Sequence, residues 1–208
     1  ASIALSKEYD YIYAACGVHP EEVDGLLENF IEILRELSKS PKCVAIGEIG
    51  LDYYWRQDNK ELQKKVFEEQ ILLAKELNLP IIVHDREAHD DTLNILKKHK
   101  PKGVLHCFSG SAEMAKEVLR LGMYIGLGGA LTFKNARKPV EVAEMLPLEK
   151  LLLETDCPYM APVPNRGKRC TSDMIALTTE KIAEVRNTDT QQLIDKTKGN
   201  AIELFRIR

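Results

Sequence analysis

The sequence lacks long apolar segments, long runs of charge of one sign and closely spaced cysteine pairs. No apolar run approaches the ~20 residues that cross a bilayer, so we expect no membrane-spanning helix and no membrane partner. The opening residues, ASIALSKEYD, lack the basic and apolar regions of a signal peptide. Five cysteines without a CxxC pair indicate reduced thiols, which predicts a cytoplasmic protein.

The charge balance argues against one class of nucleic-acid-binding protein. With 29 basic and 32 acidic residues, the formal net charge is −3. A protein that wraps duplex DNA through bulk charge needs a broad lysine and arginine surface, which this balance does not provide. A small local site for nucleic acid is still compatible with it.

The overall composition is that of a globular protein with a substantial core. The chain has 208 residues, of which 44% are hydrophobic and 29% charged. No linker, low-complexity tract or shift in composition divides it, so we predict one domain over residues 1–208.

Residues 1–9 have the pattern of an amphipathic helix and begin without methionine. We therefore expect that further residues precede Ala1 in the gene product.

Short apolar runs alternate with helical patterns along the whole chain. The runs are continuously apolar, as strands buried on both faces are, and cover residues 11–18, 43–50, 80–85, 103–109, 123–129 and 150–156. The helical patterns cover residues 22–38, 60–78, 87–99, 111–121, 138–146, 173–186 and 190–205. Repeated strand–helix units build either a doubly wound sheet or a (β/α)₈ barrel. No glycine-rich phosphate loop of the GxGxxG or GxxxxGK[ST] type supports the doubly wound sheet.

Titratable side chains stand at the carboxyl ends of the expected strands. Glu48, His84, His106 and Asp156 end four of them, and His19 follows a fifth. Barrel active sites are built on that face. Charged groups at the rim of an apolar barrel are costly unless they are paired or bind metal. Two imidazoles with two carboxylates therefore predict a divalent-metal hydrolase centre.

Other polar and aromatic residues are weaker candidates. His89 and His99 lie in helical patterns, and we interpret both as solvated. Cys107 and Cys157 flank candidate ligands, and we interpret them as packing residues. The cluster Tyr53, Tyr54 and Trp55 after Glu48 leaves two interpretations open. It packs in the core or at the rim of the fold, or it stacks on a nucleobase.

Several strings of the sequence together resemble the TatD family of metal-dependent deoxyribonucleases. They are GVHP (17–20), GEIGLDYY (47–54), VHDR (83–86), HCFSG (106–110), LLETDCPY (152–159) and RGKR (166–169). They occur in the family's order over essentially the whole chain. The resemblance implies a TIM barrel of the amidohydrolase kind. It also implies a centre of one or two divalent ions, Mg²⁺, Mn²⁺ or Zn²⁺, that hydrolyses phosphodiester bonds, with DNA as substrate. No protein partner is inferred.

The resemblance also assigns roles to individual residues. Glu48 matches the carboxylate that can bridge two metals, and His84 and His106 match imidazole ligands. Asp156 matches the carboxylate that binds the other metal and the attacking water, and it is placed to take the proton of that water. The catalytic residues are then Asp156 and Glu48.

Four further residues match positions that hold substrate. His19 and Arg86 match motif positions beside the centre, and Arg166 and Arg169 match a basic loop over it. An arginine fork fits the oxygens of a phosphate well. We therefore expect these four side chains to bind substrate.

The sequence departs from the family pattern in two places. No His-x-His pair occurs, although the first strand of the family carries one. We therefore expect an N-terminally truncated barrel with six of eight parallel strands, open between the strands at 11–18 and 150–156. Two further units of ~30 residues would give roughly the usual ~250 residues. After RGKR, residues Cys170, Thr171 and Ser172 replace the family's Asn, acidic residue and Pro.

Three functions follow from these observations. The first is a metal-dependent nuclease that cleaves DNA. The second is a deacylase or amidohydrolase that uses the same metal barrel on an ester or amide, although the basic RGKR loop favours a phosphate. The third is a truncated barrel without catalytic activity, for which the missing His-x-His pair is the argument.

Overall fold

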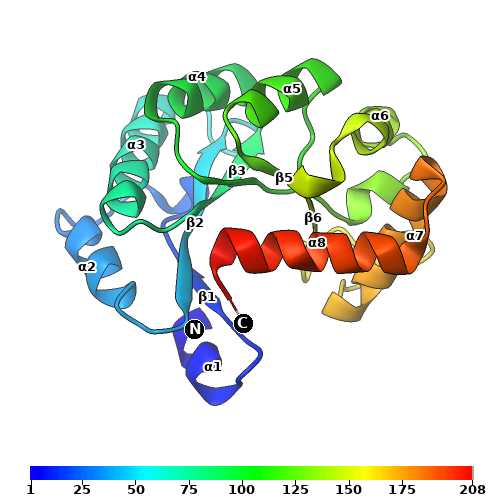
Figure 1. The fold of residues 1–208 in the computed structure, drawn as a ribbon. Helices are drawn as coiled ribbons and strands as arrows, with labels where there is room; N and C mark the ends of the chain where they lie inside the picture. The colour runs from blue at the N-terminus through cyan, green and yellow to red at the C-terminus, as the bar shows by residue number, and fades with distance from the viewer. Residues whose placement is uncertain (208) are drawn as a thin grey trace. The chain divides into compact units, whose positions relative to one another are not determined.

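The computed structural model describes residues 1–207, and its backbone contacts separate them into two compact units. Unit 1 holds Ala1–Val104 and the described residues from Leu204 onward, and unit 2 holds Leu105–Glu203. The strands β1 (Ala14–Cys16), β2 (Cys43–Asp52), β3 (Ile81–Arg86), β4 (Gly103–Leu105), β5 (Tyr124–Leu127) and β6 (Leu151–Leu153) form one sheet in that order. Helices alternate with them (Figure 1).

The strand order confirms the predicted α/β fold class. A doubly wound sheet reverses its strand order at a switch point, whereas a (β/α) barrel adds each strand beside the previous one. Here the order follows the chain from β1 to β6 without reversal, and every pairing that is described is parallel. Residues 1–207 therefore hold six strands of the TIM-barrel type, as the sequence predicted.

The helices of unit 1 are α1 (Ser2–Glu8), α2 (Phe30–Leu37), α3 (Lys60–Glu76) and α4 (His89–His99), with the short 3₁₀ turn η1 (Pro20–Glu22). Unit 2 contributes α5 (Ala112–Arg120), α6 (Arg137–Met145), α7 (Ile175–Arg186) and most of α8 (Thr190–Phe205), with 3₁₀ turns η2 (Gly129–Thr132), η3 (Leu148–Lys150) and η4 (Ser172–Met174). The helix expected at residues 1–9 is confirmed by α1. In the described residues, no helix is long and apolar enough to cross a membrane.

The helix predicted over residues 22–38 is wrong in its first half. The α-helix begins only at Phe30, and the preceding residues form η1 and turns. Gly25 has a φ of 74°, a left-handed conformation that a continuous helix does not contain. Pro20 starts a 3₁₀ turn capped by His19 instead. The turn sets the position of His19, one of the candidate site residues.

The pairing of β2 with β3 fixes the backbone around two candidate ligands. The two strands are parallel, with Gly50 opposite His84 and Asp52 opposite Arg86. Gly50 has a φ of 147°, and a Cβ atom there would lie 1.9 Å from the carbonyl oxygen of His84. Only glycine permits this approach, so the second glycine of GEIG holds the two strands together beside the site.

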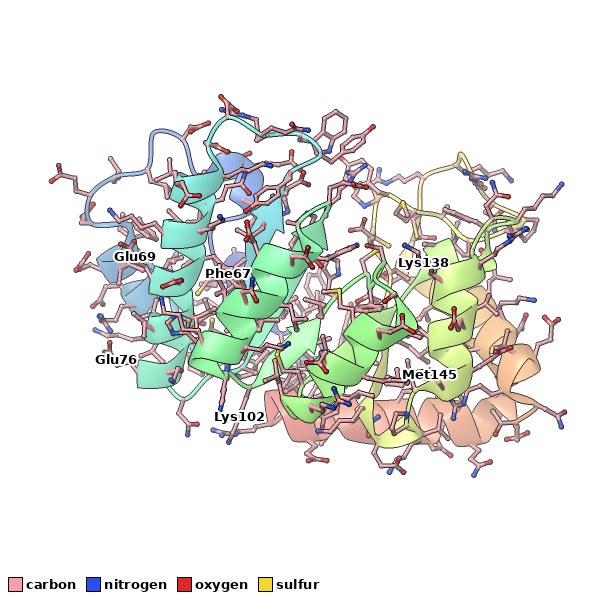
Figure 2. The ribbon with its side chains drawn as sticks, turned by 90° about the horizontal axis from the view of Figure 1, so that it is seen from above. Phe67, Glu69, Glu76, Lys102, Lys138 and Met145 are labelled. Atoms are coloured by element: carbon pink, nitrogen blue, oxygen red, sulfur yellow. The ribbon has the colours of Figure 1, made fainter. Side chains whose placement is uncertain are left out.

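The long helix α3 packs its apolar face on β2. Phe67 and Ile71 are fully buried, as are Ile46, Ile49 and Leu51 of the strand. Figure 2 shows Glu69 and Glu76 on the opposite side of α3 from Phe67. Such burial of apolar area is the main term that stabilises the unit.

Two glutamines on the buried face of α3 bind backbone rather than pack. The Gln63 side chain accepts from the N–H of Asp52 at 2.8 Å and donates to the Asp52 carbonyl at 3.0 Å. Gln70, two turns later, accepts from the N–H of Val18 at 2.7 Å and donates to its carbonyl at 3.1 Å. One helix thus anchors the chain next to His19 and at the end of β2.

Candidate metal centre

Three side chains of unit 1 converge on one point. His19 caps η1, Glu48 lies within β2 and His84 within β3. Each offers a nitrogen or carboxylate oxygen, and these atoms all lie within 4.8 Å of one another. The Nδ1 atom of His84 is 2.9 Å from Oε1 of Glu48, and Nε2 of His19 is 3.7 Å from the same oxygen. The two imidazole rings meet edge-on with their centroids 4.5 Å apart.

The donor atoms of this cluster fit a divalent cation. Imidazole nitrogens with a carboxylate oxygen suit Zn²⁺ and Mn²⁺, and the side chains are half-buried, so they are accessible yet partly shielded from water. Burial by itself lowers the pKa of His84, but the contacts with Glu48 and Asp52 outweigh burial and raise that pKa above its usual value. The two carboxylates thus favour positive charge on or beside the ring, and a metal ion bound there would displace the proton of His84.

Asp52 is a candidate site residue that the sequence analysis missed. Its side chain is completely buried, and Oδ2 lies 3.0 Å from Nε2 of His84. Its Oδ1 accepts from the N–H groups of Tyr54 and Trp55, both at 2.9 Å. A carboxylate on the far nitrogen of a ligating histidine orients the ring and raises its basicity. The available signal was strand alternation, which places Glu48 and Asp52 on the same face of β2.

The predicted substrate residue His19 lies among the candidate metal ligands. Its Nδ1 atom accepts from the N–H of Glu21 at 3.3 Å as part of the η1 cap. In the neutral ring this assigns the proton to Nε2, the atom that faces Glu48. His19 must lose the capping bond or change tautomer to bind metal through Nε2. His84 likewise has to release a proton from the nitrogen that binds, because both of its ring nitrogens face carboxylates.

In unit 2, His106 follows β4 and its Nδ1 atom lies 3.4 Å from Oε2 of Glu154. The other oxygen of Glu154 accepts from the N–H of Cys107 at 2.7 Å. A Cβ atom on Gly126 would lie 2.3 Å from the Glu154 carboxylate, so the glycine-rich strand makes room for that group. Glu154 thus orients His106 as Asp52 orients His84. The sequence analysis missed Glu154 as well.

The remaining predicted residues occupy half-buried or exposed positions. Asp156 is half-buried after β6, and its carbonyl accepts from the N–H of Tyr159. Arg86 is exposed at the end of β3, with its guanidinium over the rings of Tyr54 and Trp55. Arg166 and Arg169 are exposed in unit 2, where Arg166 lies over Phe133 at 4.4 Å. The joint action of His106 and Asp156 with Glu48 and His84 stays a prediction.

Comparison with known proteins supports metal-dependent hydrolysis. The family model described as TatD related DNase matches residues 1–206. The uncharacterized metal-dependent hydrolase YabD of Bacillus subtilis is 46% identical over 209 residues, covering 99% of this chain and 82% of its own. The uncharacterized metal-dependent hydrolase YcfH of Escherichia coli is 41% identical over 206 residues, covering 98% and 77%.

A solved structure of a family member has the same fold as this chain. The crystal structure of the TatD homologue YjjV from Escherichia coli superimposes with a TM-score of 0.94 at 34% identity. The match covers 100% of this chain and 82% of that one.

Proposed function

Since this chain belongs to the TatD family of metal-dependent hydrolases, we propose that it hydrolyses phosphodiester bonds in DNA. One observation carries the choice of substrate. His84 and Arg86 are two residues apart on β3, so their side chains leave the same face of one strand. A candidate metal ligand and an arginine on one face suit an anionic substrate, because a carbonyl group does not need a second cation.

The contacts of the Arg86 guanidinium support an anionic substrate. Within residues 1–207, no ion pair joins its guanidinium to a carboxylate, and its contacts are with the rings of Tyr54 and Trp55. Its donors are therefore available to phosphate oxygens. Arginine binds such oxygens in a two-pronged geometry that lysine does not provide.

The proposed mechanism divides the work among residues of this chain. Glu48 and His84 would hold a divalent ion, which supplies positive charge and lowers the pKa of bound water. Asp52 keeps the His84 ring in place, and Arg86 holds a non-bridging oxygen while negative charge accumulates there. Asp156 would take the proton of the water that attacks phosphorus, while the P–O bond to the leaving sugar oxygen breaks and that oxygen takes a proton from solvent.

The family resemblance extends the proposal to unit 2. His106 would complete the ligand set, with Glu154 fixing its ring orientation. Arg166 and Arg169 would hold the substrate at phosphates away from the reacting bond. With this ligand set we propose DNA as the substrate. We also propose that the protein is located in the cytoplasm.

The test compares phosphodiesters with acyl substrates. The full chain is assayed with Mg²⁺, Mn²⁺ or Zn²⁺ on DNA oligonucleotides, bis(para-nitrophenyl) phosphate, para-nitrophenyl acetate and an N-acetylated amide. We expect hydrolysis of the phosphodiesters, abolished by a chelator and strongly reduced in Arg86→Ala. Arg120→Ala, which removes an exposed arginine on α5, is the matched control.

The alternatives give different results in the same assay. Metal-dependent turnover of the ester or amide, with none of DNA, would assign the chain to the deacylases. Absence of turnover on every substrate and with every metal would favour a protein without catalytic activity.

A further inference from the structure

Two large aromatic side chains stand exposed on the loop that follows β2. Tyr54 is 53% exposed and Trp55 59% exposed. Their rings pack edge-on, with centroids 4.8 Å apart and an interplanar angle of 86°. The guanidinium of Arg86 lies 4.0 Å from the centroid of the Tyr54 ring and 5.4 Å from that of Trp55. We refer to residues 53–59 as the aromatic loop.

Hydrogen bonds to buried side chains hold the aromatic loop in place. Asp52 accepts from the N–H groups of Tyr54 and Trp55. The buried Gln63 donates to the carbonyl of Arg56 at 3.1 Å and to the side chain of Asn59 at 2.8 Å. Exposed rings on a loop fixed at both ends are preorganised, since binding a ligand does not first have to order them.

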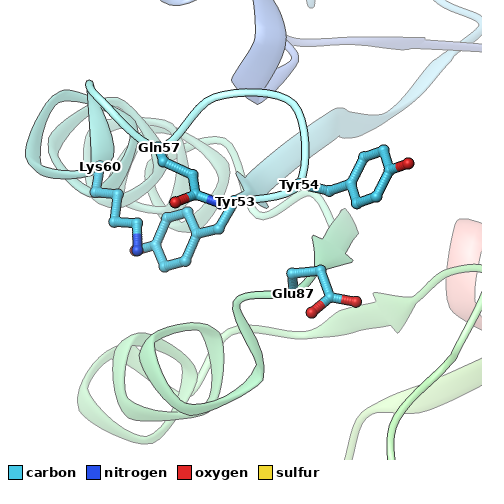
Figure 3. A pocket seen from close by; sticks show the side chains of 5 residues that line it. All are labelled: Tyr53, Tyr54, Gln57, Lys60 and Glu87. Atoms are coloured by element: carbon cyan, nitrogen blue, oxygen red, sulfur yellow. The ribbon is translucent and has the colours of Figure 1, made fainter.

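A pocket of about 450 Å³ opens beside Tyr54, and Figure 3 shows the side chains that line it. Its lining combines ring faces with an amide, an ammonium and a carboxylate, contributed by Tyr53, Tyr54, Gln57, Lys60 and Glu87. The Lys60 ammonium lies 4.3 Å from the centroid of the Tyr53 ring. Glu87 in the pocket lining directly follows Arg86, which contacts the rings of Tyr54 and Trp55. The pocket therefore lies next to the exposed rings.

We propose that the aromatic loop and Arg86 form a stacking site for an unpaired nucleobase, with the base edge or its sugar entering the adjacent pocket. The inference rests on the proposed function and narrows its substrate to single-stranded or frayed DNA. Every base has a π-face that stacks on an exposed aromatic ring, independently of sequence. In an intact duplex both faces are covered by neighbouring bases.

The charged and polar groups at this site also favour a nucleotide as its ligand. Arg86 offers donors to the phosphate that accompanies each base, and Lys60 adds a second cation at the pocket. Gln57 and Glu87 offer the donors and acceptors that a base edge requires. An apolar peptide or a lipid chain would leave these groups without partners.

The aromatic loop contains a natural reporter, because Trp55 is the only tryptophan of the chain. Tryptophan fluorescence is measured with a chelator present, so that no substrate is consumed, while single-stranded oligothymidylate is added. We expect saturable quenching, with duplex DNA of the same length binding at least about tenfold more weakly.

Variants distinguish stacking of a base on the aromatic loop from nonspecific binding of DNA to the protein. Tyr54→Ala is expected to raise the dissociation constant roughly tenfold. Tyr11→Ala removes a tyrosine that is 79% exposed outside the aromatic loop, and it should bind like wild type. Trp55→Ala is followed by the anisotropy of a labelled oligonucleotide, because it lacks the reporter. It should be weakened like Tyr54→Ala.

Three binding results would overturn the inference, and a competition result would be a fourth. They are no quenching, equal affinity for single strand and duplex, or unchanged binding by both Tyr54→Ala and Trp55→Ala. Full competition by inorganic phosphate, with none by thymidine, would equally reject a stacking site. Binding does not depend on turnover, so failure of hydrolysis with intact quenching contradicts only the proposed function. Hydrolysis of DNA without quenching contradicts only the stacking site.

Discussion

The carboxylate of Asp52 lies 3.0 Å from Nε2 of His84, while Glu48 lies 2.9 Å from Nδ1 of the same ring. His84 is thus held between two carboxylates from one strand. Only one ring nitrogen can bind a metal ion, so the carboxylate on the other nitrogen sets the orientation and basicity of the ligand.

The first prediction concerns this relationship. Asp52→Asn keeps an oxygen that can accept from the N–H groups of Tyr54 and Trp55, but it removes the negative charge beside His84. We expect affinity for Mn²⁺ or Zn²⁺ to fall by roughly 10–100-fold, measured by isothermal titration calorimetry. Asp58→Asn, an exposed change on the same loop, is the control. Equal affinities of Asp52→Asn and wild type would show that Asp52 has no part in metal binding.

The second prediction concerns Asp156. If its carboxylate takes the proton of the attacking water, Asp156→Asn keeps the shape of the side chain but loses the base. Turnover of DNA should fall by about 10²–10⁴-fold. The measurement is kcat on an oligonucleotide at saturating metal. Asp173→Asn, in η4 of the same unit, is the matched control. Full activity of Asp156→Asn would refute the assigned role.

The third prediction compares two glycines. Gly50→Ala places a Cβ atom 1.9 Å from the His84 carbonyl oxygen at a φ that L-residues rarely adopt. We expect the free energy of unfolding to fall by about 1–3 kcal/mol. Gly199→Ala lies in α8 with no atom within 4 Å of the new Cβ, and it should raise that free energy by about 0.5–1 kcal/mol. Urea denaturation measures both, and effects of the same sign would contradict the prediction.

The fourth prediction concerns the pH dependence of stability. Lys64, at 2.8 Å, and the Tyr53 hydroxyl, at 2.7 Å, hold the pKa of Asp91 below its usual value of 3.8. A lowered pKa in the folded state stabilises the protein above pH 3.8, and the contribution disappears as the pH falls through the folded pKa. Because the side chain is 37% exposed, we expect less than about 1 kcal/mol.

Asp91→Asn should therefore lower the free energy of unfolding at neutral pH, with the difference from wild type shrinking in acid. Denaturant unfolding across a pH series measures this. Asp90→Asn changes the exposed neighbouring residue and serves as control. A difference that grows as the pH falls would have the wrong sign for a lowered pKa.

Much of the fold was predictable from the sequence because its strands are short and continuously apolar. That pattern located all six strands, although β1 is shorter than residues 11–18 and β2 continues to Asp52. The helix expected over residues 22–38 was wrong in its first half, because helical periodicity of apolar residues does not register the left-handed turn at Gly25.

The site was predictable in part for a related reason. Glu48 and His84 stand near the ends of apolar runs, so their position alone marked them, and the structure brings them together with His19. Asp52 and Glu154 were missed because their roles depend on which imidazole they face, and that is set by strand register. Gln63 and Gln70 were missed because, in a sequence, a glutamine on a helix has the pattern of a solvated residue.

The hydrogen bonds that fix the aromatic loop have a consequence for protein engineering. Asp52 binds the backbone at the start of the segment, and Gln63 binds the Arg56 carbonyl and the Asn59 side chain, while Tyr54, Trp55 and Gln57 are exposed. The residues between these two anchors thus form an exchangeable cassette. We expect that sequences of equal length that keep Asp52, Asn59 and Gln63 can replace it and change what the loop binds without altering Glu48 or His84.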